Sequence, residues 1–202
     1  LSMVTLIARQ ASNTPVLIQG ETGTGKGLLA KAIHRLGSRR LKPFLELNCS
    51  AMVPTLLEDT LFGHEPGAYT DAKQAGQGFF EAANGGILFL DEIGELSPEA
   101  QSKLLKVLEE QRFYRLGGTQ PVQVDVMVIA ATHRQLGDLM EQGRFREDLY
   151  YRLQVLSLWV PPLRERREDV LPIAHHFLKH FCQKLGKRIS GFDPAFLHWF
   201  SQ

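Results

Sequence analysis

Residues 20–27 read Gly20-Glu21-Thr22-Gly23-Thr24-Gly25-Lys26-Gly27, a glycine-rich run that carries one lysine. The apolar residues 16–18 before it indicate a buried strand, and residues 28–33, beginning with Leu28, place apolar side chains at helical spacing. Glycines allow a tight turn that brings several backbone N–H groups towards one point, and the N-terminus of the next helix adds partial positive charge there. Since Lys26 adds a full charge, residues 20–28 are predicted to form a phosphate-binding loop. A plain glycine-rich turn between strand and helix is the alternative.

Gly27 stands where such loops usually offer a Ser or Thr hydroxyl to magnesium, so a bound ion would depend on water and on carboxylates elsewhere. Residues 87–90, Ile-Leu-Phe-Leu, read as a strand buried on both faces and run directly into Asp91 and Glu92. In open α/β folds, ligands bind at the carboxyl ends of the strands. We therefore expect Asp91 to hold the Mg²⁺ of Mg-ATP, mostly through water, and Glu92 to polarise the attacking water. An acidic strand end that caps the next helix is the alternative.

The composition is that of a globular α/β protein. The 202 residues are 44% hydrophobic, which suffices for one large domain, or for one domain and a small appendage. A formal net charge of +1 argues against nucleic-acid binding over the whole surface. Cys49 and Cys182 lack metal-ligand spacing and are expected to be free thiols in a reducing compartment, the cytoplasm. No apolar run is long enough to cross a membrane, and the abrupt, helix-like ends indicate part of a longer protein.

Strand-like and helix-like segments alternate along the chain, which indicates a parallel sheet with helices on both faces. We expect a core at residues 1–166 and a second, helical unit at residues 167–202. The expected strands are residues 16–19, 43–48, 87–90, 122–131 and 155–160; the expected helices are residues 1–9, one that ends near 36, 55–61, 97–110, 136–142, 145–153, 169–184 and 194–202; and residues 63–78 are expected to be mostly loop.

Further motifs accompany the loop and the acidic pair. They are Leu47-Asn48-Cys49, the segment from Glu58 to Glu65, Gly67-Ala68-Tyr69-Thr70, Phe80-Glu81-Ala82 with Gly85-Gly86, Phe145-Arg146-Glu147-Asp148-Leu149-Tyr150-Tyr151-Arg152-Leu153, and Pro161-Pro162-Leu163-Arg164-Glu165-Arg166. With these motifs in this order, essentially the whole chain resembles the central AAA+ ATPase domain of bacterial enhancer-binding proteins, the activators of sigma-54 RNA polymerase.

The resemblance implies an α/β P-loop NTPase fold of the AAA+ type, with a parallel sheet and a truncated C-terminal helical lid. It implies a homo-oligomeric ring, expected to be a hexamer, that binds ATP and Mg²⁺ and hydrolyses ATP at its subunit interfaces. Hydrolysis would remodel the sigma-54 RNA polymerase holoenzyme so that transcription begins. DNA binding would belong to a separate domain that the chain does not contain.

The resemblance implies functional roles for polar residues at two strand ends. Asn48 ends the second strand, and in relatives such an Asn holds the catalytic glutamate until the ring is engaged; a turn-forming Asn is the alternative. Thr132 and His133 end a later strand, at the position of the sensor that reads the γ-phosphate. Relatives usually carry Asn where His133 stands, and a plain polar strand end is the alternative here.

Three arginines also match the family. Arg146 and Arg152 correspond to arginines that are projected into the nucleotide of the neighbouring subunit, where a guanidinium suits the charge on a transferring phosphoryl group. Two solvated arginines that pair with Glu147 and Asp148 are the alternative. Arg115 is expected in a second, shorter pore loop, for which a glycine turn is the alternative.

The loop that begins at Gly67 is, by the resemblance, the part that contacts the sigma factor. Its usual form is Gly-Ala-Phe-Thr-Gly-Ala, and this chain reads Gly67-Ala68-Tyr69-Thr70-Asp71-Ala72. Tyr69 keeps an aromatic tip, whereas Asp71 replaces a glycine, adds charge and removes freedom at positive φ.

Other functions stay open at this point. Asp71 favours a transcription regulator that uses ATP for oligomer assembly and does not engage sigma-54. A nucleotide-binding oligomerisation module without turnover is a second alternative. A DNA-binding module is a third, and the net charge near zero argues against it.

Overall fold

The structure is a computed structural model that describes residues 2–10, 13–70 and 72–193. Its internal contacts divide the chain into two compact units, Leu1–Val160 and Pro161–Gln202, and each is described here by itself. The division falls at Pro161-Pro162 and not at residue 166, where the sequence analysis placed it. A proline lacks the N–H that a strand needs, so this pair ends the last strand and residues 161–166 group with the second unit.

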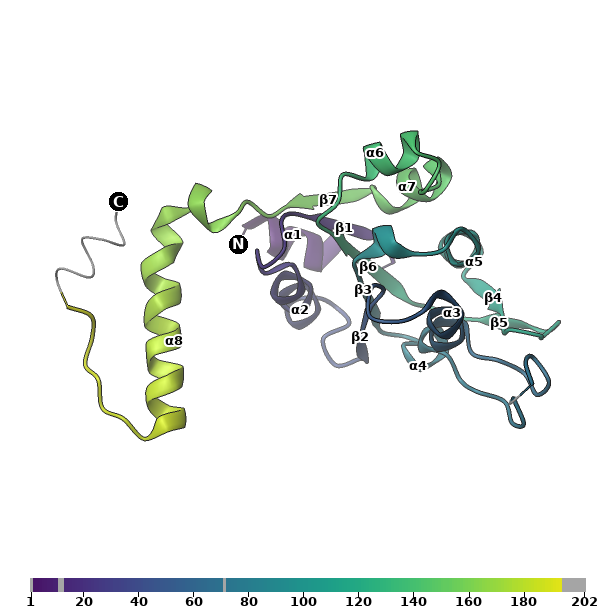
Figure 1. Ribbon diagram of the computed structural model, residues 1–202, viewed down its shortest axis with the longest axis horizontal. Coiled ribbons are helices and arrows are strands. Elements are labelled where there is room, and N and C mark those ends of the chain that lie inside the picture. The colour runs from purple at the N-terminus through teal and green to yellow at the C-terminus, as the bar shows by residue number, and fades with distance from the viewer. Residues whose placement is uncertain (1, 11–12, 71, 194–202) are drawn as a thin grey trace. The chain divides into compact units, whose positions relative to one another are not determined.

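Five parallel strands form the central sheet of the first unit, in the order β2-β3-β6-β1-β7 (Figure 1). They are β1 (Val16–Gln19), β2 (Phe44–Asn48), β3 (Ile87–Asp91), β6 (Met127–Thr132) and β7 (Leu156–Trp159). Every neighbouring pair is parallel. The carboxyl ends of all the strands therefore lie at one edge of the sheet, and the segments that follow β1, β3 and β6 emerge there together. The predicted parallel α/β fold is confirmed.

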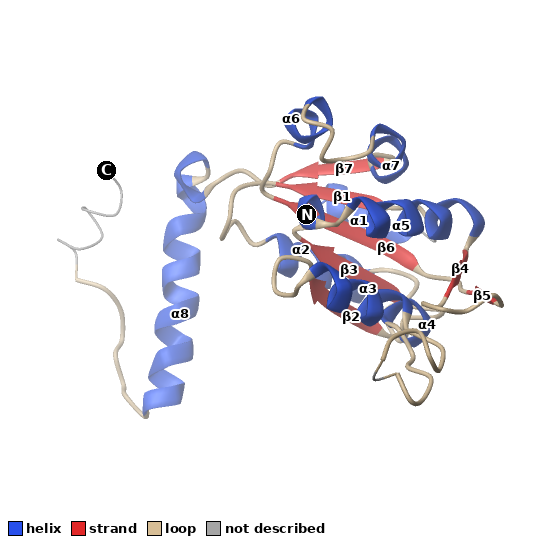
Figure 2. Ribbon diagram, turned by 45° about the vertical axis from the view of Figure 1, so that its right-hand side comes forward, coloured by secondary structure: helices blue, strands red, loops and turns tan. Residues whose placement is uncertain are grey.

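Helices cover both faces of this sheet, and the strands divide their apolar side chains between the two faces (Figure 2). Ile87 and Phe89 pack with α1 (Ser2–Gln10) and α2 (Lys26–Leu36). Leu88 and Leu90 point the other way, because successive side chains of a strand alternate, and they join the larger core cluster. That second face is covered by α3 (Pro54–Phe62), α4 (Phe79–Ala82), α5 (Pro98–Glu110), α6 (Leu136–Glu141) and α7 (Glu147–Leu153).

Helix α5 begins where its sequence predicts. Ser97 is the N-cap, and its hydroxyl accepts a hydrogen bond from the backbone N of Ala100 at 3.1 Å. Pro98 occupies the first helical position, where no N–H partner is needed. Leu104 is buried against the sheet.

The prediction of one continuous strand at residues 122–131 is wrong. The structure has β5 (Pro121–Gln123), then a short connection, then β6. β5 pairs antiparallel with β4 (Arg112–Tyr114) in a hairpin that the sequence analysis did not foresee. The change of pattern marks the break, since valines alternate with polar residues up to Val126 and the run is continuously apolar from Met127.

The second unit consists of the short 3-10 helices η2 (Leu163–Glu165) and η3 (Arg167–Asp169) followed by α8 (Val170–Leu185). The helix expected at residues 169–184 is thereby confirmed, and the one expected at 194–202 lies outside the described residues. Phe177 and Phe181, one turn apart on α8, are solvent-exposed. Within the described ranges, no helix combines the length and apolar character that crossing a membrane requires.

Candidate functional site

The loop between β1 and α2 has a conformation that its glycines permit. Gly20 and Gly25 have φ values of 156° and 97°, which side chains rarely adopt. A Cβ on Gly20 would lie 2.5 Å from the carbonyl oxygen of Val160, so a side chain has no room there. Gly25 is the N-cap of α2, and its carbonyl accepts a hydrogen bond from the N of Leu29 at 3.0 Å. The loop therefore curves around the N-terminus of α2, where free N–H groups collect.

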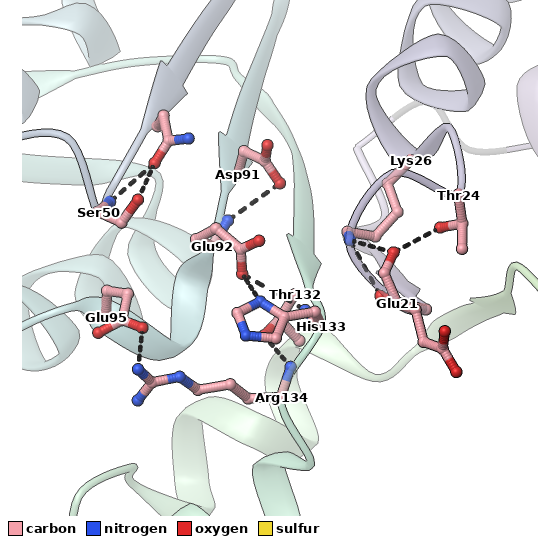
Figure 3. Close-up of polar contacts among 12 residues, drawn as sticks. Glu21, Thr24, Lys26, Ser50, Asp91, Glu92, Glu95, Thr132, His133 and Arg134 are labelled. Carbon is pink, nitrogen blue, oxygen red and sulfur yellow. Dashed lines mark hydrogen bonds and ion pairs between the residues drawn. The ribbon is translucent and has the colours of Figure 1, made fainter. Parts of the chain in front are cut away.

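Lys26 is the first residue of α2, and only 7% of it is exposed. Its Nζ donates hydrogen bonds to the carbonyl oxygens of Gly20 at 2.9 Å and Glu21 at 3.1 Å, inside the curve of the loop (Figure 3). The hydroxyl of Thr24 donates to the same Glu21 oxygen at 2.8 Å. Leu28 is 75% exposed on the first turn of the helix. A full positive charge is thus fixed at the N-terminus of a helix, which suits a bound phosphate.

Asp91 ends β3 at the same sheet edge, in register with Asn48 at the end of β2. Burial raises the pKa of the Asp91 carboxyl and the neighbouring Glu92 also raises it, while the positive charge of Lys26 lowers it. The ammonium of Lys26 is thus close enough to the Asp91 carboxyl to act on it electrostatically.

Cys49, the residue after β2, lies close to these carboxylates. It is 2% exposed, and its backbone N donates to the carbonyl oxygen of Asp91 at 2.9 Å. Burial, together with the charges of Asp91, Glu92 and Glu95, raises the pKa of the thiol to about 12. The acidic strand end is therefore a place where a cation would be stabilised.

The side chain of Glu92 points to His133, which follows β6 (Figure 3). Nδ1 of His133 lies 2.7 Å from Oε2 of Glu92, and the backbone N of His133 donates to the same oxygen at 3.4 Å. The backbone of Glu92 is left-handed, with φ 56° and ψ 51°, which is uncommon for a residue with a side chain. Such conformations gather at functional sites, so this one supports a functional role for Glu92.

Asn48 does not hold Glu92 in the structure. Its Oδ1 accepts hydrogen bonds from the backbone N of Ser50 at 2.8 Å and from the Ser50 hydroxyl at 2.7 Å. This is the turn-forming arrangement of an Asn at a strand end, which the sequence analysis kept as the alternative.

Thr132 lies between the phosphate loop and the segment that follows β6. It is fully buried, and its carbonyl oxygen accepts a hydrogen bond from the N of Gly20 at 3.3 Å. Its hydroxyl accepts a hydrogen bond from the N of Arg134 at 3.0 Å. A movement of the phosphate loop would therefore be transmitted to the segment after β6, and the reverse.

The two candidate arginine fingers contact residues outside the phosphate loop. Arg146 forms a two-point ion pair with Asp148 and also donates to the Ser102 hydroxyl at 3.2 Å. Arg152 donates to the carbonyl oxygen of Leu108 at 2.9 Å. Within the described part of the chain, no hydrogen bond or ion pair joins either guanidinium to residues 20–28.

The sequence analysis missed Gln101, which positions Arg146. Gln101 is buried in α5, and its amide donates to the carbonyl oxygens of Leu96 and Arg144, both at 2.9 Å. Its Oε1 accepts a hydrogen bond from the backbone N of Arg146 at 2.8 Å. A polar residue on the buried side of a predicted helix, three positions before Leu104, was the available signal.

The loop expected to contact the sigma factor folds back onto α3. The N of Gly67 donates to the carbonyl oxygen of Ala72 at 2.8 Å, and the hydroxyl of Tyr69 donates to Oδ2 of Asp59 at 3.3 Å. Nδ1 of His64 lies 2.6 Å from the other oxygen of Asp59. Ala68 and Thr70 belong to the same turn, and Asp71, the departure from the usual motif, lies outside the described residues.

Arg115 anchors the β4–β5 hairpin beside that loop. Its guanidinium donates to both oxygens of Glu81 at 2.7 Å and to Glu65 at 2.8 Å, and these bonds raise its pKa. The backbone of Leu116 also bonds to Gly63 and Glu65. The expected second loop is therefore connected directly to the first by an ion pair and by backbone hydrogen bonds.

The residues present suit magnesium held jointly with a nucleotide. Among the described residues, no group of three or more His, Cys, Asp or Glu side chains could hold a metal ion by itself. Mg²⁺ usually keeps several waters and binds one or two carboxylates plus substrate phosphates. Asp91 would supply a carboxylate, and a nucleotide held by the phosphate loop would supply the phosphates. At Gly27, an added Cβ would lie 3.6 Å from Cε1 of Phe89 and 3.7 Å from Oε1 of Glu46, so the position has room for a side chain.

The glycine loop joins strand β1 to helix α2, which carries the buried Lys26. This unit lies beside the acidic end of β3, and β6 lies between β1 and β3. This arrangement defines a P-loop nucleotide-binding domain. Residues 2–159 match the Sigma-54 interaction domain, and the chain belongs to that family.

Two regulatory proteins illustrate the similarity in sequence. The transcriptional regulatory protein ZraR of Klebsiella oxytoca is 48% identical over 194 residues, which cover 96% of this chain and 43% of ZraR. The Nif-specific regulatory protein of Bradyrhizobium diazoefficiens is 51% identical over 190 residues, covering 94% of this chain and 32% of that protein. The chain thus spans less than half the length of these relatives.

The crystal structure of NtrX from Brucella abortus in complex with ATP is similar in fold. It superposes with a TM-score of 0.87 at 37% identity, and the match covers 96% of this chain and 41% of NtrX. NtrX in complex with ADP matches equally well, with a TM-score of 0.87.

Proposed function

We propose that this chain is the ATP-hydrolysing domain of a transcriptional activator that remodels sigma-54 RNA polymerase so that the promoter opens. The observation that carries the proposal is the placement of Lys26 and of the pair Asp91 and Glu92 at one sheet edge, with Lys26 acting electrostatically on Asp91. The relatives described above are transcriptional regulatory proteins, and NtrX was solved with ATP.

Each group at the edge has a distinct task in this proposal. The N–H groups of residues 20–27 and the ammonium of Lys26 bind the phosphates of ATP, and Thr24 stabilises the loop through Glu21. Asp91 holds magnesium, which neutralises phosphate charge when bound. Glu92 orients and polarises the attacking water, and Thr132 connects the end of β6 to the loop.

Hydrolysis is proposed to occur between subunits of a ring, with a hexamer expected. Arg146 pairs with Asp148 and Arg152 bonds to the carbonyl oxygen of Leu108, and neither has a described contact with the phosphate loop of its own chain. In this proposal they exchange these contacts for the nucleotide of a neighbouring subunit. A guanidinium from a neighbour would stabilise charge on the transferring phosphoryl group. Arg146→Ala should therefore spare ATP binding and strongly reduce hydrolysis, measured as nucleotide affinity and phosphate release; an unchanged rate would exclude the assignment.

The turn of residues 67–72 is proposed to contact sigma-54 and to move with the state of the γ-phosphate. Residues 167–202 are proposed as the start of a helical lid. DNA binding is assigned to a separate domain of the full-length protein, and the cytoplasm is the proposed location.

Phosphate release by the full-length protein is the test of the enzymatic part. Glu92→Gln, which keeps the shape and removes the charge, should retain ATP binding and lose turnover. Turnover at the wild-type rate in that variant would overturn the role of Glu92.

The partner is tested separately. Immobilised sigma-54 should retain the full-length protein in the presence of a transition-state nucleotide analogue. Loss of retention with turnover intact would favour the regulator that does not engage sigma-54, the reading to which Asp71 points.

A further inference from the structure

The second residue of α2 has no side chain, although phosphate loops usually have a hydroxyl there. Gly27 is that residue, and a Ser or Thr in its place would offer an oxygen to magnesium. A Cβ built on Gly27 would lie 3.7 Å from Oε1 of Glu46 in β2 and 3.6 Å from Cε1 of Phe89. A carboxylate oxygen from β2 therefore lies beside the space that the missing hydroxyl would occupy.

The register of β2 and β3 directs Glu46 to the side of the sheet that carries the phosphate loop helix. Glu46 lies opposite Phe89, which is two residues before Asp91 on β3. Residues in register on parallel strands project to the same face, and so do residues two apart on one strand. Phe89 packs with α2 on that face. The side chains of Glu46 and Asp91 therefore belong to the face that α2 covers.

The two carboxylate oxygens of Glu46 have different surroundings. Oε2 lies 2.8 Å from Nζ of Lys31, which is one turn further along α2 than Gly27. Oε1, the oxygen beside Gly27, makes no hydrogen bond or ion pair within the described residues. The Glu46 side chain is 43% exposed, so water has access to it. One oxygen is therefore paired with Lys31, and the other is available to accept from a water molecule.

The charge of Glu46 acts on the acidic end of β3. Burial raises the pKa of the Asp91 carboxyl most, the charge of Glu92 raises it next, and the charge of Glu46 adds to both. Carboxylates from two neighbouring strands therefore repel one another at this edge of the sheet. A divalent cation there would offset the repulsion, so the placement of Glu46 favours a metal ion that is bound together with the nucleotide.

We propose that Glu46 is a positioning residue that replaces the missing hydroxyl: its Oε1 accepts a hydrogen bond from a water of the magnesium ion that is bound with ATP. The inference rests on the proposed function, because it names a further residue at the same metal site. Mg²⁺ keeps several waters, so a carboxylate beyond its direct ligands can orient it. Outer partners of this kind typically contribute about 10- to 100-fold to metal affinity. Asp91 and Glu46 would thus hold the hydrated ion from two neighbouring strands.

The nucleotide affinity of the full-length protein, measured by calorimetry with a non-hydrolysable ATP analogue, tests the assignment. Each variant is titrated once with Mg²⁺ and once with a chelator. Glu46→Gln keeps the shape and removes the charge, so the gain in affinity that Mg²⁺ provides should fall on the order of tenfold. Affinity without the metal should stay equal or rise, because a negative charge near the phosphates is removed. Lys31→Ala breaks the same ion pair but keeps the carboxylate, and this matched control should retain the full gain.

A restored hydroxyl supplies the second comparison. Gly27→Ser should raise the affinity for the Mg²⁺-bound analogue more in Glu46→Gln than in the wild type, since groups that share a task are not additive. An unchanged gain from Mg²⁺ in Glu46→Gln, or an equal loss in Lys31→Ala, would overturn the inference, while nucleotide binding and phosphate release by the wild type would leave the proposed function intact. A wild-type protein that neither binds the analogue nor releases phosphate would overturn both. Thermal unfolding shows whether each variant is folded, and Glu46→Asp, whose shorter side chain withdraws the carboxylate from Gly27, should also lose part of the gain and replaces Glu46→Gln if that variant is unfolded.

Discussion

The nucleotide edge of the sheet and the loop at residues 63–78 are held by different kinds of interaction. At the edge, functional residues follow strands whose side chains are almost completely buried, such as β3 and β6. The described part of the loop contains no strand or helix, and it is held by the side chains of Arg115 and Asp59 and by backbone bonds to Leu116. The first region is fixed by packing, whereas the second is fixed by polar bonds that can be exchanged. The proposed division of tasks, with nucleotide bound at the sheet edge and movement of the loop, would use this difference.

The largest effect is expected at the sheet edge. Lys26→Ala removes the buried ammonium from the loop and should weaken ATP binding on the order of 100-fold, about 3 kcal/mol, because the phosphates lose their fixed positive charge. Isothermal titration calorimetry would measure it. Lys31→Ala on the same helix, where the lysine pairs with Glu46 at 2.8 Å and is half exposed, is the control and should retain its affinity. Equal ATP affinity in Lys26→Ala and Lys31→Ala would show that Lys26 does not bind the nucleotide.

The next largest effect is expected where the loop is anchored. Arg115→Met removes the bonds to Glu81 and Glu65 and should lower the free energy of unfolding by about 2 kcal/mol, since Glu81 is left largely buried without a partner. Hydrogen exchange of residues 63–78 should accelerate more than that of β3. Arg112→Met on the same hairpin, an exposed arginine paired only locally with Glu110, should leave exchange unaltered. Uniform acceleration over the sheet would show that the loop is not a separate unit.

A smaller gain is expected from restoring a hydroxyl at the edge. Gly27→Ser fits the space available and should raise affinity for Mg-ATP, but not for ATP without magnesium, by about threefold to tenfold, as a hydroxyl ligand would. Gly27→Ala is the control, because it adds the Cβ and raises helix propensity even more than serine does, without the oxygen. Identical affinities for the two variants would mean that the metal does not reach this position.

The smallest effect is expected for one oxygen atom in the loop. Tyr69→Phe removes the hydroxyl that donates to Asp59 at 3.3 Å and should cost about 0.5 kcal/mol of local stability, because the bond is long and exposed. Amide exchange of residues 67–72 should rise about twofold, with ATP affinity unchanged. Tyr114→Phe, another exposed tyrosine, is the control. Slower exchange in Tyr69→Phe would show that the hydroxyl strains the turn.

Patterns that depend on neighbouring residues were readable from the sequence. The phosphate loop, the acidic end of β3 and the cap of α5 each follow from local spacing, and the structure has these elements where they were expected. The β4–β5 hairpin was not predicted, because its pairing joins residues that are separate in sequence and its strands are very short. The partner of Glu92 also escaped prediction. Asn48 ends β2 and His133 directly follows β6, the two strands that flank β3, and only side-chain geometry decides which of them reaches the carboxylate.

The thiol of Cys49 has a practical consequence. Burial and the nearby carboxylates raise the pKa of this thiol well above its usual range and leave it almost without solvent exposure, so an alkylating reagent meets an unreactive thiol in the native fold. The rate of labelling at Cys49 would therefore report how often the core of the sheet opens. Cys182, in the other unit and partly accessible, would give a second and independent signal in the same mass spectrum.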